Sequence, residues 1–213
     1  MKNLQGNHMS ENLTLENEKI REFIETLFKP DEIINITRIE EPEPNDRKAK
    51  IQSKNFTQRQ FPIVKNLPGQ GTFICPNSLQ VNTRRAEINL NKINTIFIDF
   101  DDLTIEQSKN LKNIKIPPNI ISKRSEKNQH FYYLIEPLEN KLENLLKYKT
   151  ILKYFVENFG ADKQVINPAG LIRLPGTIRY KDNTKQMYTY QVLSKDRFNI
   201  NYYISVMSVV IGA

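Results

Sequence analysis

Two aspartates, Asp99 and Asp101, follow the apolar run Ile96-Phe-Ile98. The run predicts a buried strand, and side chains two residues apart in a strand point to the same face, roughly 7 Å from each other. Two carboxylates that close repel each other unless a cation lies between them. Because Mg²⁺ and Mn²⁺ prefer oxygen ligands, the pair predicts a metal site. The alternative is a solvated strand end without a ligand.

The neighbouring Asp102 fits that alternative better than its two companions do. Thr104 and Gln107, which follow it, have the spacing of a capping box. We therefore expect a helix to begin at Thr104, and we confine the metal hypothesis to Asp99 and Asp101.

A basic turn precedes a second apolar strand. The turn at 123–128 carries Lys123, Arg124 and Lys127, and His130 follows it at the start of the strand. These groups could bind a triphosphate, with His130 donating a hydrogen bond to the same group. The alternative is a solvated loop followed by a structural histidine. Alternation along the strand predicts that His130, Tyr132 and Leu134 share one face and that Phe131, Tyr133 and Ile135 share the other.

A third feature combines an acid with a buried base. Asp162 follows a helix that Gly160 ends, and Arg173 lies inside the apolar stretch 171–174. A guanidinium group in apolar surroundings needs an anionic partner. Beside a metal-carboxylate site it would clamp a phosphate, while the alternative is an internal Asp–Arg salt bridge.

The composition indicates a globular protein with an anionic partner. The chain has 213 residues, of which 26% are charged and 38% hydrophobic, and its net charge is +7. This charge suits nucleic acid, and Arg84 and Arg85 suit a template groove that is read through phosphates. Cys75 is the only cysteine, which excludes an internal disulfide and a multi-cysteine zinc site. We find no signal peptide and no segment long enough to span a membrane, and we expect a cytoplasmic protein.

Hydrophobic periodicity predicts alternating helices and strands. We expect residues 51–68 to form a strand or short helix with a basic face, and Pro137 to end the strand that contains His130. Helices are predicted at 15–28, 104–112, 142–159 and 200–211. Strands are predicted at 33–39, 72–75, 94–102, 119–122, 129–135, 171–174 and 187–193.

Together the three features resemble the archaeo-eukaryotic primase superfamily, in its primase–polymerase branch of plasmid RepB-like or CRISPR-associated type. Ile98-Asp-Phe-Asp101 is similar to its motif I and His130-Phe-Tyr-Tyr133 to motif II. Asp162 with Arg173-Leu-Pro-Gly-Thr177 is similar to motif III. The resemblance extends from residue 69 to about residue 193. One departure is that Asn128 stands two residues before the histidine, where the family usually has serine, and the nearest serine is Ser125.

The resemblance implies an α/β (α+β) fold of two lobes. An RRM-like catalytic sheet at about 93–195 would carry the motifs, and a helix-containing N-terminal lobe would span about 14–92. We expect a disordered N-terminus at 1–13, a C-terminal helix within 196–213, and a single catalytic domain from 14 to 213.

The resemblance also implies an activity, which is template-dependent nucleotidyl transfer as a DNA primase and DNA polymerase. Two Mg²⁺ or Mn²⁺ ions would be held by Asp99, Asp101 and Asp162. The incoming dNTP or NTP would be bound by Arg124, Ser125, His130, Arg173 and Lys181. DNA template and primer would be the partners, together with further domains of a longer chain, such as helicase or CRISPR adaptation proteins.

Two other functions stay open at this point. A metal-dependent phosphatase of the haloacid-dehalogenase type also begins with a strand and two alternate aspartates, but Asp102 and Leu103 then stand where it would have a small residue and a threonine or valine. A non-catalytic RRM-like nucleic-acid-binding module would use Phe131 and Tyr133 to stack on bases. It would leave the carboxylates without a role.

Overall fold

The computed structural model describes residues 4–40, 49–163, 165–181 and 184–211 of the chain, with side chains for 16–40, 49–163, 165–179 and 184–207. Its α-helices are α1 (Leu4–Leu27), α2 (Ile105–Asn110), α3 (Leu142–Phe159) and α4 (Ile200–Ile211). Short 3₁₀ helices span Gln58–Gln60, Glu87–Asn89 and Leu111–Asn113. The strands are β1 (Ile33–Glu40), β2 (Ile51–Thr57), β3 (Gln70–Leu79), β4 (Leu90–Phe100), β5 (Ile120–Ser125), β6 (Asn128–Glu139), β7 (Ile172–Arg173), β8 (Ile178–Lys181), β9 (Thr184–Met187) and β10 (Thr189–Val192).

One antiparallel sheet runs through the molecule. Its strand order is β10-β5-β6-β4-β3-β1-β2, and β7 pairs with β3 beside this path. The chain order β4-α2-β5-β6-α3-β7 is the β-α-β-β-α-β order expected of an RRM-like unit. This unit joins the N-terminal strands through a short pairing of β3 with β4, at Ser78↔Lys92 and Leu79↔Leu90. The predicted lobe boundary near residue 92 therefore falls within a shared sheet, and the division into lobes stays a prediction.

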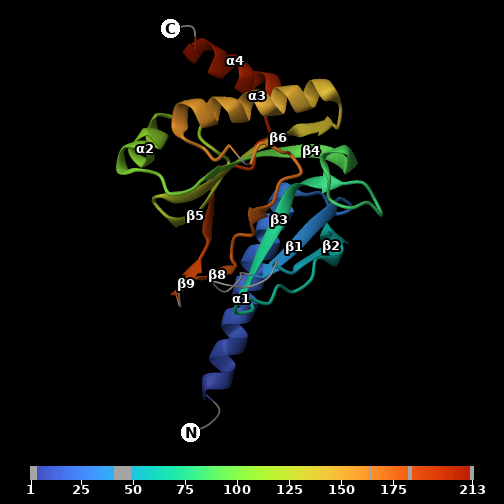
Figure 1. The fold of residues 1–213 in the computed structure, drawn as a ribbon. Coiled ribbons are helices and arrows are strands. Elements are labelled where there is room, and N and C mark those ends of the chain that lie inside the picture. Colours follow the sequence, from blue (N-terminus) through green and yellow to red (C-terminus); the bar gives the residue numbers. More distant parts are fainter. Residues whose placement is uncertain (1–3, 41–48, 164, 182–183, 212–213) are drawn as a thin grey trace.

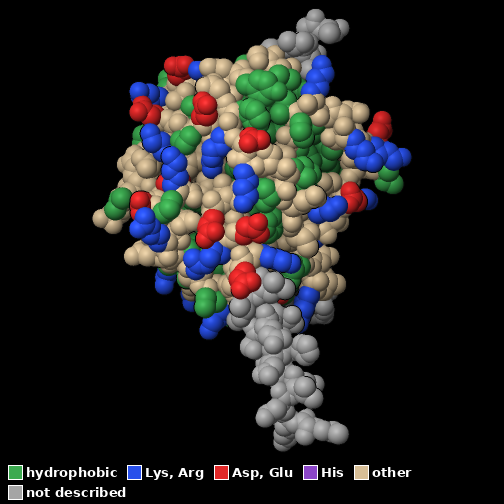
Figure 2. All heavy atoms as spheres, turned by 180° about the vertical axis from the view of Figure 1, so that it is seen from behind, with side chains coloured by type: hydrophobic (Ala, Val, Ile, Leu, Met, Phe, Trp, Pro, Cys, Tyr) green, Lys and Arg blue, Asp and Glu red, His purple; other side chains and the backbone are tan. Residues whose placement is uncertain are grey.

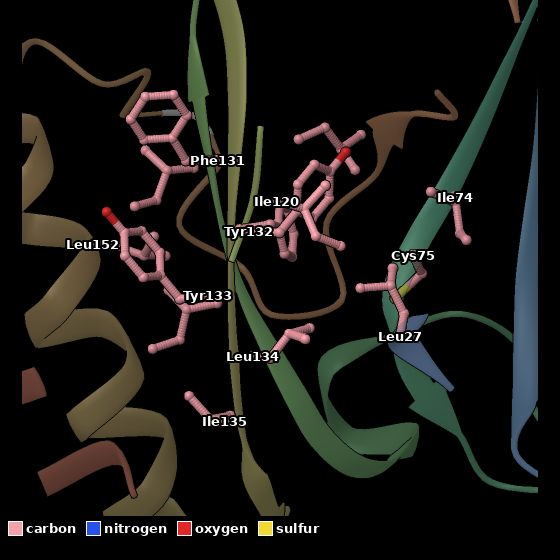
Figure 3. Packing of buried hydrophobic residues seen from close by; sticks show 14 of the residues in the cluster. Leu27, Ile74, Cys75, Ile120, Phe131, Tyr132, Tyr133, Leu134, Ile135 and Leu152 are labelled. Atoms are coloured by element: carbon pink, nitrogen blue, oxygen red, sulfur yellow. The ribbon is translucent and has the colours of Figure 1, made fainter. Parts of the chain in front are cut away.

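Helices cover both faces of the RRM-like part (Figure 1). On one face, Phe23 of α1 packs edge-on against Tyr132 and Tyr190. On the other, Tyr133 packs against Phe155 of α3 and Tyr203 of α4. The predicted alternation along β6 is confirmed, because successive side chains enter different layers (Figure 3). Burying each such aromatic ring contributes roughly 1.5–3 kcal/mol, so the strand is fixed in its register from both sides.

The local signals around the acidic strand are confirmed. Thr104 caps α2, and its side chain and that of Gln107 form a reciprocal capping box. Gly160 ends α3 in the left-handed conformation, with φ of 73°. A Cβ atom there would lie 2.5 Å from Nε2 of Gln107, so the cap of α2 and the end of α3 touch. These two helix ends fix the chain just after Asp101 and just before Asp162.

Several predicted boundaries were wrong, since β3 is longer than 72–75 and the predicted strand 187–193 is divided between β9 and β10, and two further differences bear on the fold. The first helix begins at Leu4 rather than near residue 15, so it includes part of the segment that we expected to be disordered. β6 continues past Pro137 to Glu139, because the proline is exposed at a point where the pairing with β4 shifts register between Ile93 and Thr95. Proline lacks an N–H donor, and such an irregularity tolerates the loss. Residues 51–68, which we left open, contain the strand β2 and a 3₁₀ helix.

Arg197 donates hydrogen bonds to the backbone at this register shift between β4 and β6. Its Nη1 atom donates to the carbonyl groups of Asn94 and Ile135, at 2.9 and 3.0 Å. Its Nη2 atom donates to the carbonyl groups of Thr26 and Leu27 in the last turn of α1, at 3.1 and 2.9 Å. One cation therefore satisfies four carbonyl groups that neither helix nor sheet pairing reaches, and it joins α1 to both central strands.

The face turned away in Figure 1 carries Lys and Arg side chains mixed with Asp and Glu (Figure 2). Hydrophobic side chains gather near its upper end, where α3 and α4 lie. Leu142, Leu146, Phe198 and Tyr202 are among the exposed apolar residues of these segments. Within the part of the chain that the structure describes, every helix is too short or too polar to cross a membrane.

Replacing Arg197 by Ala should lower the free energy of unfolding by about 2–4 kcal/mol, because it leaves carbonyl groups at the register shift and at the end of α1 without donors. Arg59→Ala is the matched control. Its ion pair with Asp31 spans 3.7 Å between side chains that are 70% and 87% exposed, so the loss should stay below about 0.5 kcal/mol. Urea denaturation measures both. Equal losses in the two variants would contradict the role of Arg197.

Candidate active site

The three candidate metal ligands lie in the same region, near the end of β4. Asp99 is the second-last residue of β4, and Asp101 directly follows Phe100, the last residue of the strand. Asp162 is brought to them by the backbone, since its N–H group donates to the carbonyl group of Asp99 at 2.8 Å. The segment after α3 thus lies against β4 at the level of Asp99, and residues 63 positions apart in sequence become neighbours.

The pKa of Asp99 is affected by its burial and by the two neighbouring acids. Its side chain is 17% exposed. Burial raises the pKa of Asp99 to about 8, and the negative charges of Asp101 and Asp162 add to the increase, while Arg124 opposes it. The Oδ1 atom of Asp99 is buried and accepts no hydrogen bond from the described residues. A carboxylate in this state is stabilised by a cation more than by any other ligand.

His130 lies directly across the sheet from Asp99, as the paired residue on β6. Its Nε2 atom is 3.4 Å from Oδ1 of Asp99 but does not form a hydrogen bond with it. Burial lowers the pKa of His130 to about 3, and the positive charges of Arg173 and Arg124 contribute. The imidazole is therefore neutral at physiological pH. Its Nδ1 atom is buried and has no partner within the described part of the chain, so it can still bond to a ligand.

Tyr188, which the sequence analysis did not single out, lies at the centre of the candidate site. Its ring stacks on His130, with centroids 4.9 Å apart and planes 22° apart. The guanidinium carbons of Arg124 and Arg173 are each 5.9 Å from the same ring. The sequence offered only its place in the predicted strand 187–193, because a lone tyrosine in a strand has no characteristic spacing.

The basic turn contributes Arg124 through a short network. Arg124 donates to Oδ1 of Asn128 and, at 2.8 Å, to Oε1 of Gln186 on β9. Asn128 in turn donates to the hydroxyl of Ser125 at 3.1 Å. Ser125 is exposed and also accepts from the backbone of Lys127, which makes it part of the turn. Asn128, the residue that departs from the family's serine, therefore orients Arg124.

Arg173 enters the site from β7 and is buried, with 8% of the residue exposed. Its guanidinium carbon lies 4.6 Å from the centroid of the Phe73 ring. Gly71 makes this approach possible, because a Cβ atom there would lie 2.7 Å from the Phe73 ring and 2.8 Å from Nη1 of Arg173. Gly71, at the start of β3, therefore leaves space for the arginine that a larger residue would fill.

Three other residues were predicted to bind phosphate groups, namely Lys181, Arg84 and Arg85. Lys181 is the last residue of β8, and its side chain lies outside the described residues. Arg85 donates to the carbonyl group of Ala169 at 2.5 Å, which ties it to the loop before β7. Arg84 is exposed and stays a candidate for contact with a phosphate backbone.

The base-stacking role considered for Phe131 and Tyr133 was wrong. Both side chains are buried, with 4% and 1% exposed. Phe131 packs against Phe100 of β4, and Tyr133 packs against Phe155 of α3. A base cannot reach these rings in the folded protein.

The donor set fits hard divalent cations. Oxygen atoms of Asp99, Asp101 and Asp162 are the ligand type that Mg²⁺ and Mn²⁺ prefer. The buried, unbonded Oδ1 of Asp99 is the observation that supports this fit. In the described residues, no three His, Cys, Asp or Glu side chains are yet close enough together to hold one ion. Binding would therefore require the carboxylates to move toward the ion.

The raised pKa of Asp99 predicts how the metal-free protein responds to pH. The folded protein keeps the Asp99 proton up to about pH 8, while the unfolded chain loses it near 3.8, so stability should fall as the pH rises between these values. His130 acts in the opposite direction between about pH 3 and 6.5. Between pH 6.5 and 8 the contribution of Asp99 is thus no longer opposed by His130.

Melting temperatures in EDTA at pH 6.5 and pH 8 test this for the wild type and Asp99→Asn. The stability advantage of the variant should grow as the pH rises. Parallel pH profiles of the two proteins would contradict the raised pKa.

Comparisons with known proteins give one relative in sequence and several in structure. No family model matches the chain. A replication protein of Clostridium perfringens is 26% identical over 151 residues, which are 63% of this chain and 36% of that protein. The chain thus spans about a third of the length of this curated relative.

Solved structures resemble the chain over most of its length. The AEP domain of the cyanophage S-2L primase-polymerase aligns with a TM-score of 0.66 and 15% identity, covering 89% of this chain and 97% of that one. Primase RepB′ aligns with a TM-score of 0.56 and 15% identity, over 91% and 63% of the two chains. Its catalytic domain in complex with initiator DNA aligns with a TM-score of 0.52 and 14% identity, over 91% and 95%. The chain therefore has the archaeo-eukaryotic primase fold that its three motifs predicted.

Proposed function

We propose that the chain is a template-dependent nucleotidyltransferase with DNA primase and DNA polymerase activity. The observation that carries the proposal is the meeting of Asp99, Asp101 and Asp162 beside two arginines, with a buried carboxyl group whose pKa is raised to about 8. Negative and positive groups this close suit a metal-bound triphosphate. The names of the structural neighbours, a primase-polymerase and a primase, agree with this chemistry.

In this proposal the three carboxylates hold two Mg²⁺ or Mn²⁺ ions. The ions, when bound, lower the pKa of the attacking 3′-hydroxyl and stabilise the charge on the pyrophosphate that leaves. Asp99 is the ligand that depends on them most, because its Oδ1 atom is buried and accepts no hydrogen bond from the described residues. Asp162 is oriented by its backbone bond to Asp99, and Asp101 approaches from the exposed end of β4.

The cationic groups of the site would bind the triphosphate of the incoming dNTP or NTP. Arg124 lies on β5 and Arg173 on β7, and these strands pair with β6 and β3, the two neighbours of β4. Guanidinium groups bind phosphate oxygens with two parallel hydrogen bonds, which fixes orientation as well as affinity. His130, neutral and with an unbonded ring nitrogen, would donate one further hydrogen bond. Lys181, at the end of β8, stays a further candidate for the same triphosphate because of its place in the sequence motif.

DNA template and primer are the proposed partners. The net charge of +7 favours a polyanion, and contact would run through phosphates rather than base edges. One structural neighbour, the catalytic domain of primase RepB′, was solved with initiator DNA. The replication protein that matches the chain is longer than the aligned region, which is 36% of its length. Further domains of a longer chain, such as the helicase or CRISPR adaptation proteins that the sequence resemblance suggested, are therefore also proposed partners.

Primer extension and de novo priming on a single-stranded template test the proposal, with dNTPs or NTPs and with Mg²⁺ or Mn²⁺. Asp99→Asn and Asp101→Asn should each lower the rate at least about 10³-fold, the scale expected when electrostatic stabilisation of the transition state is lost. Asp102→Asn is the matched control. It removes the same charge at the neighbouring residue, whose left-handed backbone (φ 51°) asparagine tolerates. Its activity should stay near that of the wild type.

DNA binding by fluorescence anisotropy should persist in all three variants, because removing negative charge does not weaken contact with phosphates. Wild-type protein that binds DNA but incorporates no nucleotide with either metal would contradict the proposed activity. Hydrolysis of a phosphomonoester without template would favour the phosphatase alternative instead.

His130→Ala separates nucleotide binding from structure. Loss of one hydrogen bond to a charged group, roughly 1.5–3 kcal/mol, should raise the KM for nucleotide about 10- to 150-fold and change kcat little. KM and melting temperature are measured on the same preparation. A lower melting temperature with an unchanged KM would show that His130 has only a structural role.

A further inference from the structure

Tyr188 contacts three of the side chains that are proposed to bind the triphosphate. Its ring lies 4.9 Å from the His130 ring and 5.9 Å from the guanidinium carbons of both Arg124 and Arg173. These three side chains come from β5, β6 and β7. A ring that reaches all of them couples their positions, because none can shift without losing contact with it.

The backbone holds this ring in place. The carbonyl group of Tyr188 accepts from the N–H of Gly176 at 2.7 Å, and its N–H donates to the carbonyl group of Thr177 at 3.2 Å. The hydroxyl of Thr177 in turn donates to the carbonyl group of Leu174 at 2.6 Å. The turn that follows Arg173 and the residue that contacts Arg173 are therefore one hydrogen-bonded unit.

Tyr188 also stands at the point where the chain leaves one sheet for another. β9 pairs with β8 in a two-stranded sheet, and β10 pairs with β5 at the edge of the large sheet. The residue between them is 3% exposed, whereas β9 on one side of it is exposed throughout. A buried aromatic residue at such a crossing is held from both sides, which suits it to fix its neighbours.

We propose that Tyr188 is a positioning residue whose aromatic ring aligns Arg124, His130 and Arg173 for the triphosphate of the nucleotide. The inference rests on the proposed function. The electron-rich face of the ring attracts the guanidinium groups, which would otherwise repel each other. The flat stacking on His130 fixes the direction of the imidazole. Phe73 supports the same arrangement, since it contacts Arg173 at 4.6 Å.

The role depends on the ring and not on the hydroxyl, and two substitutions separate them. Tyr188→Leu removes the ring, so we expect the KM for dNTP to rise roughly tenfold, the size of effect that cation–π contacts have, with kcat changed less than about threefold. Tyr188→Phe keeps the ring and should restore the wild-type KM. Tyr202→Leu is the control for loss of an aromatic ring elsewhere, because Tyr202 is exposed and stacks on Phe198.

Calorimetric titration with tripolyphosphate and Mg²⁺ gives a second measurement, which needs neither template nor turnover. The dissociation constant should increase roughly tenfold in Tyr188→Leu and not in Tyr188→Phe or Tyr202→Leu. Melting temperatures identify any variant that does not fold. If Tyr188→Leu does not fold, Tyr188→Met replaces it, since methionine fills a similar volume without a ring.

Three outcomes are decisive. Weaker binding in the ringless variant with rescue by phenylalanine supports the positioning role. Wild-type affinity in a folded ringless variant, or loss of affinity in Tyr188→Phe, overturns it while leaving the proposed function intact. Failure of the wild type itself to bind tripolyphosphate overturns the positioning role, while primer extension tests the proposed function separately.

Discussion

The candidate site depends on the burial of one carboxyl group, Asp99, next to two others. Taking a carboxylate out of water costs free energy, and nearby negative charges increase the cost. The protein meets this cost in part by keeping the group protonated, with a pKa near 8, and in part by placing Arg124 within electrostatic reach. The arrangement contributes nothing to stability by itself. It makes physical sense as a site that is completed by cations.

The fold builds this site from backbone geometry more than from side-chain contacts. Antiparallel pairing sets His130 opposite Asp99, and a backbone hydrogen bond sets Asp162 beside it. Helices on both faces fix the register of β6, so the pairing cannot slip without exposing one aromatic layer. At the far end of the same strands, Arg197 satisfies the carbonyl groups that the register shift leaves open.

Much of this arrangement could be predicted from the sequence, because its signals are local. Apolar alternation gave the faces of β6, and capping residues gave the start of α2 and the end of α3. What could not be predicted depends on contacts between distant residues. Pro137 was expected to end its strand, but it lies where the pairing of β6 with β4 shifts register, and Arg197, 60 positions later, donates to the carbonyl group of Ile135 there. Tyr188 and Gly71 acquire their roles from Arg173, which reaches them through pairing of β7 with β3.

The most direct test of the central claim is to locate Mn²⁺ by anomalous scattering in crystals grown with Mn²⁺ and a non-hydrolysable dNTP. The claim is that Asp99, Asp101 and Asp162 hold the cations and that the arginines bind the triphosphate. It predicts anomalous peaks bounded by the three carboxylates, with phosphate oxygens between them and the guanidinium groups of Arg124 and Arg173. Peaks located elsewhere in well-ordered crystals, or a triphosphate bound away from both arginines, would contradict it.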